Sequence, residues 1–382
     1  MYDILWCLSL SFLVTSISIP VILTIAREKK LVDLPNARKI HKTPIPSLGG
    51  VGIFGGFVLG CLLCTSFERT PEFQFFMAAA LIVFFFGLKD DILIISPVKK
   101  LCGQLMAAFL IIYKGGLRFS NFYGVFDLNT VDPIYGFILT FFTIIVIMNA
   151  FNLIDGIDGL AASLGLMVSV FLGIYFLKAG FISYAVLSFS LTGSLAAFLF
   201  FNFQPAKIFM GDTGSQLIGM VSAILVIKFI IAAPVSQVWS INSSPALGFS
   251  VVLIPLLDTL RVFMIRIGKR KSPFMADRIH IHHILLDKGL SQRNINFILL
   301  AFNVIVIMLV YSGRSIGNGW LIFFMTLGYF GSVKILHLLP MERNVQPVSE
   351  ISLYSEGLNI KTIAKTTVIV KKAPGRIKIQ SK

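Results

Sequence analysis

The feature that most limits the fold of this chain is a series of apolar stretches, each close to the roughly 20 residues that a helix needs to cross a bilayer. We count eleven of them, near residues 4–26, 48–67, 73–88, 98–114, 134–150, 160–177, 181–201, 213–232, 246–265, 295–312 and 318–338. Hydrophobic residues make up 56% of the chain and charged residues 13%, whereas soluble domains have roughly 45–50% and 25%. The sequence therefore predicts an all-α, polytopic membrane protein with about eleven transmembrane helices.

The two ends of the chain set the expected limits of the membrane domain. Residues 4–26 are long for a signal peptide and follow no basic segment, so we interpret them as the first span. The chain after Pro340 is basic and has a strand-like composition. We therefore expect a membrane-embedded domain over residues 1–338 and a cytoplasmic basic tail over residues 339–382.

The cysteines offer little chemistry. Cys7, Cys61, Cys64 and Cys102 all lie in or beside apolar stretches. Cys61 and Cys64 have the spacing of half a zinc site, but the chain has no second pair to complete it. We interpret all four as small packing residues.

The net charge of +15 predicts the orientation of the chain in the membrane. The loops alternate between two sides, and one side carries only Arg69, Lys114, Arg118, Lys178 and Arg314. The other side holds most of the basic residues, so we expect its loops and the C-terminus to be cytoplasmic. Because the basic residues lie between apolar spans, we expect them to contact anionic membrane lipids and expect no nucleic-acid partner.

A polar segment, 149–161, follows the apolar run 141–148. It contains two amides, two carboxylates and two glycines, namely Asn149, Asn152, Asp155, Asp158, Gly156 and Gly159. Polar groups at the end of a hydrophobic span are typical of functional sites in membrane enzymes and transporters. Glycine allows the backbone to approach a ligand closely. A solvated turn between two helices is the alternative interpretation.

Two further acidic motifs occur at predicted span ends. Asp90 and Asp91 are adjacent at the end of the third span, so they repel each other unless a cation such as a metal or Lys89 lies beside them. A solvated acidic turn is equally compatible with this motif. The run 209–215 begins the eighth span, where free backbone N–H groups can bind anionic oxygens. Asp212 would repel a phosphate there unless a divalent cation joins the two, which indicates magnesium; a simple helix cap is the alternative.

Basic residues with the potential to bind phosphate gather in two loops. Residues 33–50 form a basic loop with three prolines that enters the second span through glycines. The last long loop contains Arg278, His280, His282 and His283. These histidines could bind zinc, but the hard oxygen ligands elsewhere favour magnesium, and the cluster is better suited to donating to phosphate oxygens. Solvated basic loops remain the alternative.

All of these motifs fall on the predicted cytoplasmic side. A proton or ion transporter would be expected to place ionisable groups near the middle of the membrane. Only Asp258, Arg261 and Lys228 approach that depth. The distribution favours a shallow site that faces the cytosol over a transport pathway.

Taken in order, the motifs from Asp33 to His283 resemble the polyprenyl-phosphate N-acetylhexosamine-1-phosphate transferases of glycosyltransferase family 4. The form His280-Ile-His282-His283, preceded by Asp277-Arg278, resembles the N-acetylglucosamine-1-phosphate branch. The resemblance implies transfer of a sugar-1-phosphate from a UDP-N-acetylhexosamine to undecaprenyl phosphate with release of UMP, an early step of cell-envelope polysaccharide synthesis. It places the enzyme in the inner membrane and leaves a homodimer open.

The resemblance also implies roles for single residues. Asn152 and Asp212 match magnesium ligands, with manganese as an alternative ion. Gly156 and Phe209 match positions around the uracil ring, and Asp158 matches the position that hydrogen-bonds it. The candidate catalytic residues are Asp90, Asp91, Asp155, His280, His282 and His283, and the candidate substrate-binding residues include Asn149, Lys89 and Arg278, with Lys100 expected nearby. The peptidoglycan translocases, which transfer phospho-N-acetylmuramoyl-pentapeptide, and a cation-coupled transporter are the alternative functions.

Overall fold

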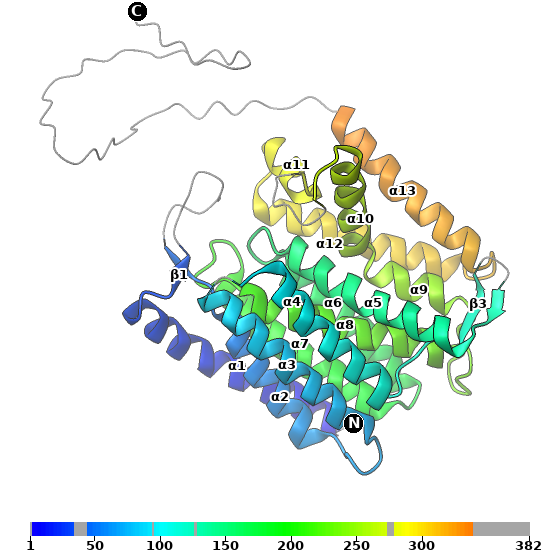
Figure 1. The fold of residues 1–382 in the computed structure, drawn as a ribbon, viewed down its shortest axis with the longest axis horizontal. Helices are drawn as coiled ribbons and strands as arrows, with labels where there is room; N and C mark the ends of the chain where they lie inside the picture. Colours follow the sequence, from blue (N-terminus) through cyan, green and yellow to red (C-terminus); the bar gives the residue numbers. More distant parts are fainter. Residues whose placement is uncertain (1, 34–43, 94, 126–127, 273–278, 339–382) are drawn as a thin grey trace, which may run out of the picture. The chain divides into compact units, whose positions relative to one another are not determined.

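The computed structural model describes residues 2–33, 44–93, 95–125, 128–272 and 279–338, most of them in helices (Figure 1). The helices are α1 (Tyr2–Glu28), α2 (Gly49–Cys64), α3 (Glu72–Ile92), α4 (Pro97–Phe109), a π-helical turn η1 (Leu110–Lys114), α5 (Pro133–Ile154), α6 (Leu160–Lys178), α7 (Ile182–Asn202), α8 (Gly211–Ala232), α9 (Ser244–Val251), α10 (Leu253–Gly268), α11 (Ile281–Asp287), α12 (Gln292–Ser312) and α13 (Asn318–Leu338). Two short antiparallel pairs join β1 (Val32–Asp33) to β2 (Ile45–Pro46) and β3 (Asn121–Val125) to β4 (Leu128–Thr130). The predicted tail, residues 339–382, lies outside the described residues.

The chain is an all-α, polytopic membrane protein, as the apolar stretches predict. Within the described residues, seven helices are long and apolar enough to cross a membrane, namely α1, α5, α6, α7, α8, α12 and α13, and the bent pair α9–α10 makes an eighth if it is one span. The expected count of about eleven spans is not confirmed. At 1.5 Å per residue, α2 with 16 residues and α4 with 13 are shorter than a bilayer core of about 30 Å.

The predicted ninth span, residues 246–265, is broken by a 78° bend between α9 and α10. Pro255 lies in the first turn of α10 and has no N–H to donate to the carbonyl of Val251. The fully buried side chain of Asn303 in α12 bonds to the backbone carbonyls at the break. Its amide nitrogen lies 3.0 Å from the carbonyl oxygen of Ser250 and 3.4 Å from that of Val251. The carbonyl groups at the break thus find their hydrogen-bond donor in a side chain about fifty residues further along the sequence.

Helix α8 lies at the centre of the bundle and packs against α2, α3, α5 and α6 (Figure 1). Nearly all of its side chains are buried. A side chain at Gly50 of α2 would collide with the backbone of Gly214, and a Cβ at Gly87 of α3 would lie 2.6 Å from the Thr213 Cα. These glycines let the start of α2 and the end of α3 pack closely against the start of α8.

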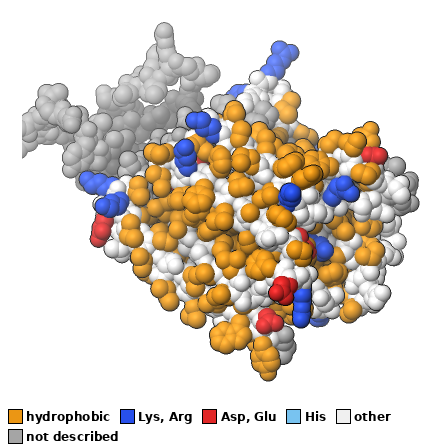
Figure 2. Space-filling model, turned by 60° about the horizontal axis from the view of Figure 1, so that its bottom comes forward, with side chains coloured by type: hydrophobic (Ala, Val, Ile, Leu, Met, Phe, Trp, Pro, Cys, Tyr) orange, Lys and Arg blue, Asp and Glu red, His pale blue; other side chains and the backbone are white. Residues whose placement is uncertain are grey.

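Hydrophobic side chains cover most of the face that Figure 2 shows, with few charged groups among them. Exposed aromatic residues such as Phe85, Phe142 and Phe200 lie on helices α3, α5 and α7. A soluble protein rarely exposes apolar surface on this scale, whereas lipid tails would cover it. This surface agrees with a protein whose helices lie in a membrane.

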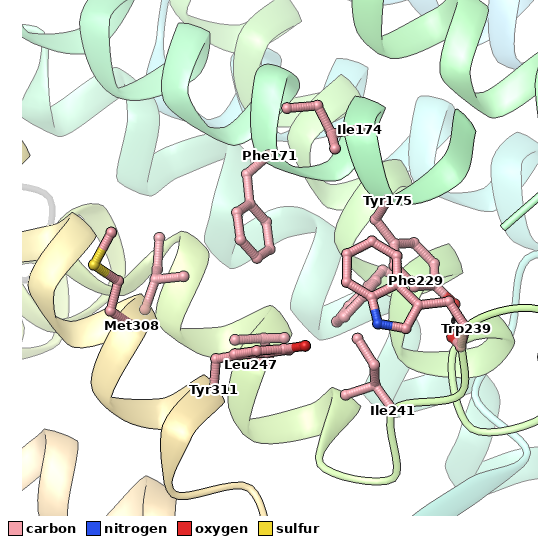
Figure 3. Close-up of a pocket in the computed structure, with 10 residues that line it drawn as sticks. Phe171, Ile174, Tyr175, Phe229, Trp239, Ile241, Leu247, Met308 and Tyr311 are labelled. Atoms are coloured by element: carbon pink, nitrogen blue, oxygen red, sulfur yellow. Dashed lines mark hydrogen bonds between the residues drawn. The ribbon is translucent and has the colours of Figure 1, made fainter. Parts of the chain in front are cut away.

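An apolar pocket of about 270 Å³ lies between α6, α8, α9 and α12 (Figure 3). Its lining is aliphatic and aromatic: Phe171, Ile174, Tyr175, Phe229, Trp239, Ile241, Leu247, Ile307, Met308 and Tyr311. These residues come from the C-terminal halves of α6, α8 and α12, from α9 and from the loop after α8. The polar motifs 149–161 and 209–215 lie at the opposite, N-terminal ends of α6 and α8, so this pocket is remote from them.

Candidate active site

Asp91 joins the end of α3 to the start of α8. One of its carboxylate oxygens accepts from the backbone N–H of Asp212 at 2.6 Å, and the other accepts from the N–H and the hydroxyl of Thr213 at 3.0 and 2.6 Å. Gly211 precedes them with a φ of +71°, a conformation that favours glycine. The first N–H groups of a helix have no partner within it, so Asp91 caps α8 from another helix and fixes the place of Asp212.

Five polar side chains from four helices meet beside this cap. The ammonium of Lys100, in the first turn of α4, donates to the carboxylate of Asp212 and lies 3.2 Å from the amide oxygen of Asn152 and 3.4 Å from Asp90. The amide nitrogen of Asn152 donates to the other Asp212 oxygen at 2.8 Å and to the hydroxyl of Ser215 at 3.0 Å. The predicted metal ligands, Asn152 and Asp212, are therefore in direct contact.

The cation beside the acidic pair is Lys100 and not Lys89. Lys89 is adjacent to Asp90 in sequence, and the acidic pair by itself predicted a metal ion or Lys89 as its companion. Among the described residues, however, the ion pair of Asp90 is with Lys100, which the first turn of α4 directs to the site. Neighbours on one helix turn point in different directions, whereas Lys100 approaches from the next helix.

The Asp212 and Asn152 oxygens form a site suited to a magnesium ion. Both point at one cation, the Lys100 ammonium, so the space between them accepts positive charge. No group of three or more His, Cys, Asp or Glu residues in the described part of the chain could hold a metal. Magnesium is commonly bound through one or two carboxylates and completes its shell with water and substrate phosphate oxygens. The two residues fit that arrangement, with Asn152 adding an amide oxygen to the single carboxylate of Asp212.

The segment between α5 and α6 is anchored by residues that the sequence patterns did not single out. The N–H of Asp158 donates to the side chain of Gln292 at 2.8 Å, and its carboxylate accepts from the N–H of Ala206 at 3.1 Å. Asn296 donates to the Asp158 carbonyl at 2.7 Å, and Asn202 accepts from the N–H of Gly159 at 2.9 Å. These side chains come from the end of α7 and the start of α12, so the turn is held firmly from both sides.

The carboxyl group of Asp155 in this segment has a pKa above its ordinary value. It follows the last residue of α5. Burial, and then the charges of Asp91 and Asp158, raise the pKa of Asp155 to about 7. A carboxyl group with such a pKa is partly protonated at neutral pH and can hold or release a proton there.

Asp155 should make the stability of the protein depend on pH. Because its pKa is higher in the folded chain than in the unfolded chain, its contribution to the free energy of unfolding is present near pH 4 and is lost as pH rises through about 7. We expect Asp155→Asn to remove this dependence. The melting temperature of the wild type, relative to that of the variant, should fall between pH 5 and pH 8, and a constant difference would contradict the raised pKa.

The predicted histidine loop lies over the 155–159 segment. His282 is 1% exposed, and a side chain at Gly156 would collide with its Nε2. Neither ring nitrogen of His282 has a hydrogen-bond partner among the described residues. Burial, and then the charge of His283, lower the pKa of His282 to about 3, so this ring is neutral at physiological pH. A neutral, buried imidazole without partners is able to bind a polar ligand group.

His280 is held by Asp258, which the sequence singled out only for its predicted depth in the membrane. Its Nδ1 lies 2.8 Å from a carboxylate oxygen of Asp258 in α10. The ring is parallel to that of His282, with 5.6 Å between their centres. His283 follows them in α11, and Arg278 lies outside the described residues.

Two further candidates connect the site to the rest of the bundle. Asn149 donates to the side chain of Gln104 in α4 at 3.0 Å, so it supports the position of α4. The N–H of Phe209 donates to the Pro46 carbonyl at 2.7 Å, and its carbonyl accepts from the N–H of Gly49 at 2.9 Å. The end of the basic loop 33–50 is thereby tied to the segment that leads into α8.

The geometry therefore brings together several groups of the kinds that bind phosphates and metal ions. Asp90, Asp91, Asn152 and Asp212 gather around Lys100, and His282 lies directly against the 155–159 segment. A cation, an amide and carboxylates at a helix start are suited to binding a diphosphate through a metal ion.

Comparison with known proteins agrees with this chemistry. The sequence profile of glycosyl transferase family 4 matches residues 73–230. The chain is 32% identical to an undecaprenyl-phosphate alpha-N-acetylglucosaminyl 1-phosphate transferase of Yersinia pestis, over 69% of this chain and 71% of that protein. It is 34% identical to a probable undecaprenyl-phosphate N-acetylglucosaminyl 1-phosphate transferase of Bacillus subtilis, over 74% and 77%.

A decaprenyl-phosphate N-acetylglucosaminephosphotransferase of Mycobacterium tuberculosis is 32% identical over 70% of this chain and 72% of its own. Relatives at this identity and coverage share their family. The resemblance carried by the motifs is confirmed, including its branch. The chain belongs to glycosyltransferase family 4, in the branch of the polyprenyl-phosphate N-acetylglucosamine-1-phosphate transferases.

Proposed function

We propose that this protein transfers N-acetylglucosamine-1-phosphate from its UDP-sugar to undecaprenyl phosphate and releases UMP. The observation that carries the proposal is the convergence of Asp212, Asn152 and Lys100 at the start of α8. The related transferases named above use a polyprenyl phosphate and an N-acetylglucosamine phosphate. That similarity favours N-acetylglucosamine over the muramoyl-pentapeptide of the peptidoglycan translocases.

The reaction forms one bond and breaks one. An oxygen of the lipid phosphate bonds to the phosphorus that carries the sugar, and the bond from that phosphorus to UMP breaks. A magnesium ion held by Asn152 and Asp212 would neutralise charge on the diphosphate. The ammonium of Lys100, which contacts both residues, would supply a further positive charge to the diphosphate.

The remaining candidates are assigned to binding. Gly156 lies directly against His282, where only a residue without a side chain fits, and Phe209 provides an aromatic ring near the start of α8, so we assign both to the uridine. Asp158 is assigned to the uracil edge, in addition to its bond with Ala206. The neutral His282 is assigned to the sugar phosphate as a hydrogen-bonding group rather than as a charge. Release of UMP from a UDP-sugar, dependent on undecaprenyl phosphate and magnesium, tests this function.

We also propose that the site faces the cytosol, since most basic loops lie on its side of the membrane. Ser291 precedes α12 on the side of the site, and Ser240 lies in the loop between α8 and α9 at the opposite end; both are exposed. Cysteines introduced there in a chain without its four native cysteines should react with an impermeant thiol reagent from opposite sides. We expect Cys at 240 to react in intact cells and Cys at 291 only after lysis. The reverse pattern would invert the topology.

A further inference from the structure

We propose that Asp258 is a positioning residue that acts through His280 and sets the orientation of the histidine loop, residues 279–283. The inference rests on the proposed function, because its consequence is measured in the transfer reaction. Asp258 lies in α10, and neither the sequence motifs nor the family resemblance gave it a role.

The carboxylate of Asp258 is fully buried and is bonded on both oxygens. Oδ1 accepts from Arg261 at 2.8 Å, from the N–H of Ile281 at 3.0 Å and from the hydroxyl of Tyr329 at 3.2 Å. Oδ2 lies 2.8 Å from Nδ1 of His280. Burial of a charged carboxylate is costly unless such partners compensate for the lost water.

The partners of Asp258 and Arg261 show what the buried pair holds. Arg261 also donates to the carbonyl of Ile279 at 2.5 Å. Three consecutive residues, 279, 280 and 281, thus each make one hydrogen bond with the pair. An ion pair that served α10 alone would need none of these contacts. The bonds instead fix the start of α11, and the hydroxyl of Tyr329 in α13 donates to the same carboxylate.

The orientation of His280 reaches the site through its neighbour. The rings of His280 and His282 are parallel within 8°. His282 in turn lies against Gly156, where a single added carbon would collide with Nε2. A rotation of His280 would therefore displace His282 from the 155–159 segment. The path runs from α13 through Asp258 and His280 to His282.

The carboxylate also selects the tautomer of His280. An ionised carboxylate only accepts hydrogen bonds, so the ring must carry its proton on Nδ1 to bond with Asp258. Nε2 is then the nitrogen that the ring can offer to another group. Carboxylates that hold a functional histidine by one nitrogen act in this way in metal sites and in hydrolases.

Asp258→Asn is the sharpest test, because asparagine keeps the volume and one accepting oxygen. Its NH₂ group would donate to Nδ1 of His280, which must then accept and carry the proton on Nε2. We expect kcat to fall by about 10- to 100-fold, the range for residues that orient a functional histidine. Asp132→Asn is the matched control, since Asp132 caps the start of α5 and asparagine caps equally well; its kcat should equal that of the wild type.

Two readouts separate positioning from a general loss of packing. In a His280→Gln background, Asp258→Asn should cost less than about 3-fold further, because the two residues act in series. The ¹⁵N imidazole shifts of His280 should report a proton on Nδ1 in the wild type and on Nε2 in Asp258→Asn. Losses that multiply across the two substitutions, or an unchanged tautomer, would overturn the inference.

Tyr329→Phe supplies a second test that does not depend on the folding of Asp258→Asn. It removes one donor to Asp258 without removing the carboxylate, so kcat should fall several-fold. The control is Tyr175→Phe, which removes a hydroxyl bond of the same 3.2 Å length to the Trp239 carbonyl in the remote pocket. Equal rates for the two variants would contradict the role of Tyr329. A wild-type protein that releases no UMP would refute the proposed function, whereas an active wild type with a fully active Asp258→Asn refutes only this inference.

Discussion

Replacing Asp212 by asparagine is expected to lower turnover on the order of 1,000-fold while the protein stays folded. One oxygen of the Asp212 carboxylate accepts a hydrogen bond from the ammonium of Lys100, and the other accepts one from the amide nitrogen of Asn152. Loss of its charge removes the negative group that would hold the metal ion. A metal ion stabilises the charge of such a transition state by several kcal/mol, and about 1.4 kcal/mol corresponds to a factor of ten in rate.

The backbone of residue 212 explains why folding should survive. Its N–H group still donates to Asp91, so the cap of α8 does not depend on the side chain of residue 212. The magnesium concentration for half-maximal rate should rise in any residual activity. A variant with near wild-type turnover at ordinary magnesium would show that Asp212 does not hold the ion.

Asp91→Asn should reduce stability as well as turnover, in contrast to Asp90→Asn. Three donors point at the two oxygens of Asp91. An asparagine would turn its own NH₂ group toward at least one of them, and an unsatisfied buried donor costs about 1–3 kcal/mol. The start of α8, which carries Asp212, would shift with it. We expect thermal unfolding in detergent to occur several degrees lower for Asp91→Asn.

Asp90→Asn is the matched comparison, because Asp90 is the adjacent acid and accepts fewer hydrogen bonds than Asp91. It accepts from the N–H of Ile95 at 2.9 Å and lies 3.4 Å from Lys100. Its unfolding temperature should stay close to that of the wild type, while turnover falls. A larger loss of stability in Asp90→Asn than in Asp91→Asn would contradict the capping role of Asp91.

The pH response of Asp90→Asn then distinguishes a base from a positioning group. A phosphate monoester has its second pKa near 6, so the lipid phosphate is mostly a dianion at pH 7–8 and leaves little for a base to remove. We expect the variant to be slowed by a similar factor at pH 6 and at pH 9. Recovery toward the wild-type rate at pH 9 would assign Asp90 as a general base.

Local patterns in the sequence predicted the helices well because each span is apolar over its own length. All eleven predicted stretches fall on helices. The same apolarity says little about whether a helix is long enough to span, as α2 and α4 show. It also gave no sign of the 78° bend, although Pro255 was visible, because the compensating Asn303 lies in another helix.

The site was predictable where its groups adjoin in sequence. The run 209–215 indicated a helix start, and α8 begins at Gly211. The partners that complete the site come from elsewhere: Asp91 caps α8 from α3, and Lys100 approaches from α4. The residues alone predicted a metal ion or Lys89 beside the acidic pair, and only the family resemblance brought in Lys100. Asp258 was noted for its depth, but its bond to His280 spans 22 residues and required the fold.

The most direct measurement of the central claim is UMP release by the purified protein in vesicles that contain undecaprenyl phosphate. With UDP-N-acetylglucosamine and magnesium, the wild type should release one UMP for each lipid-linked sugar phosphate formed. Omission of the lipid phosphate or chelation of magnesium should stop both products, and Asp212→Asn should form almost none. Release of UMP without a lipid product, or movement of a solute across the vesicle membrane without UMP, would contradict the account.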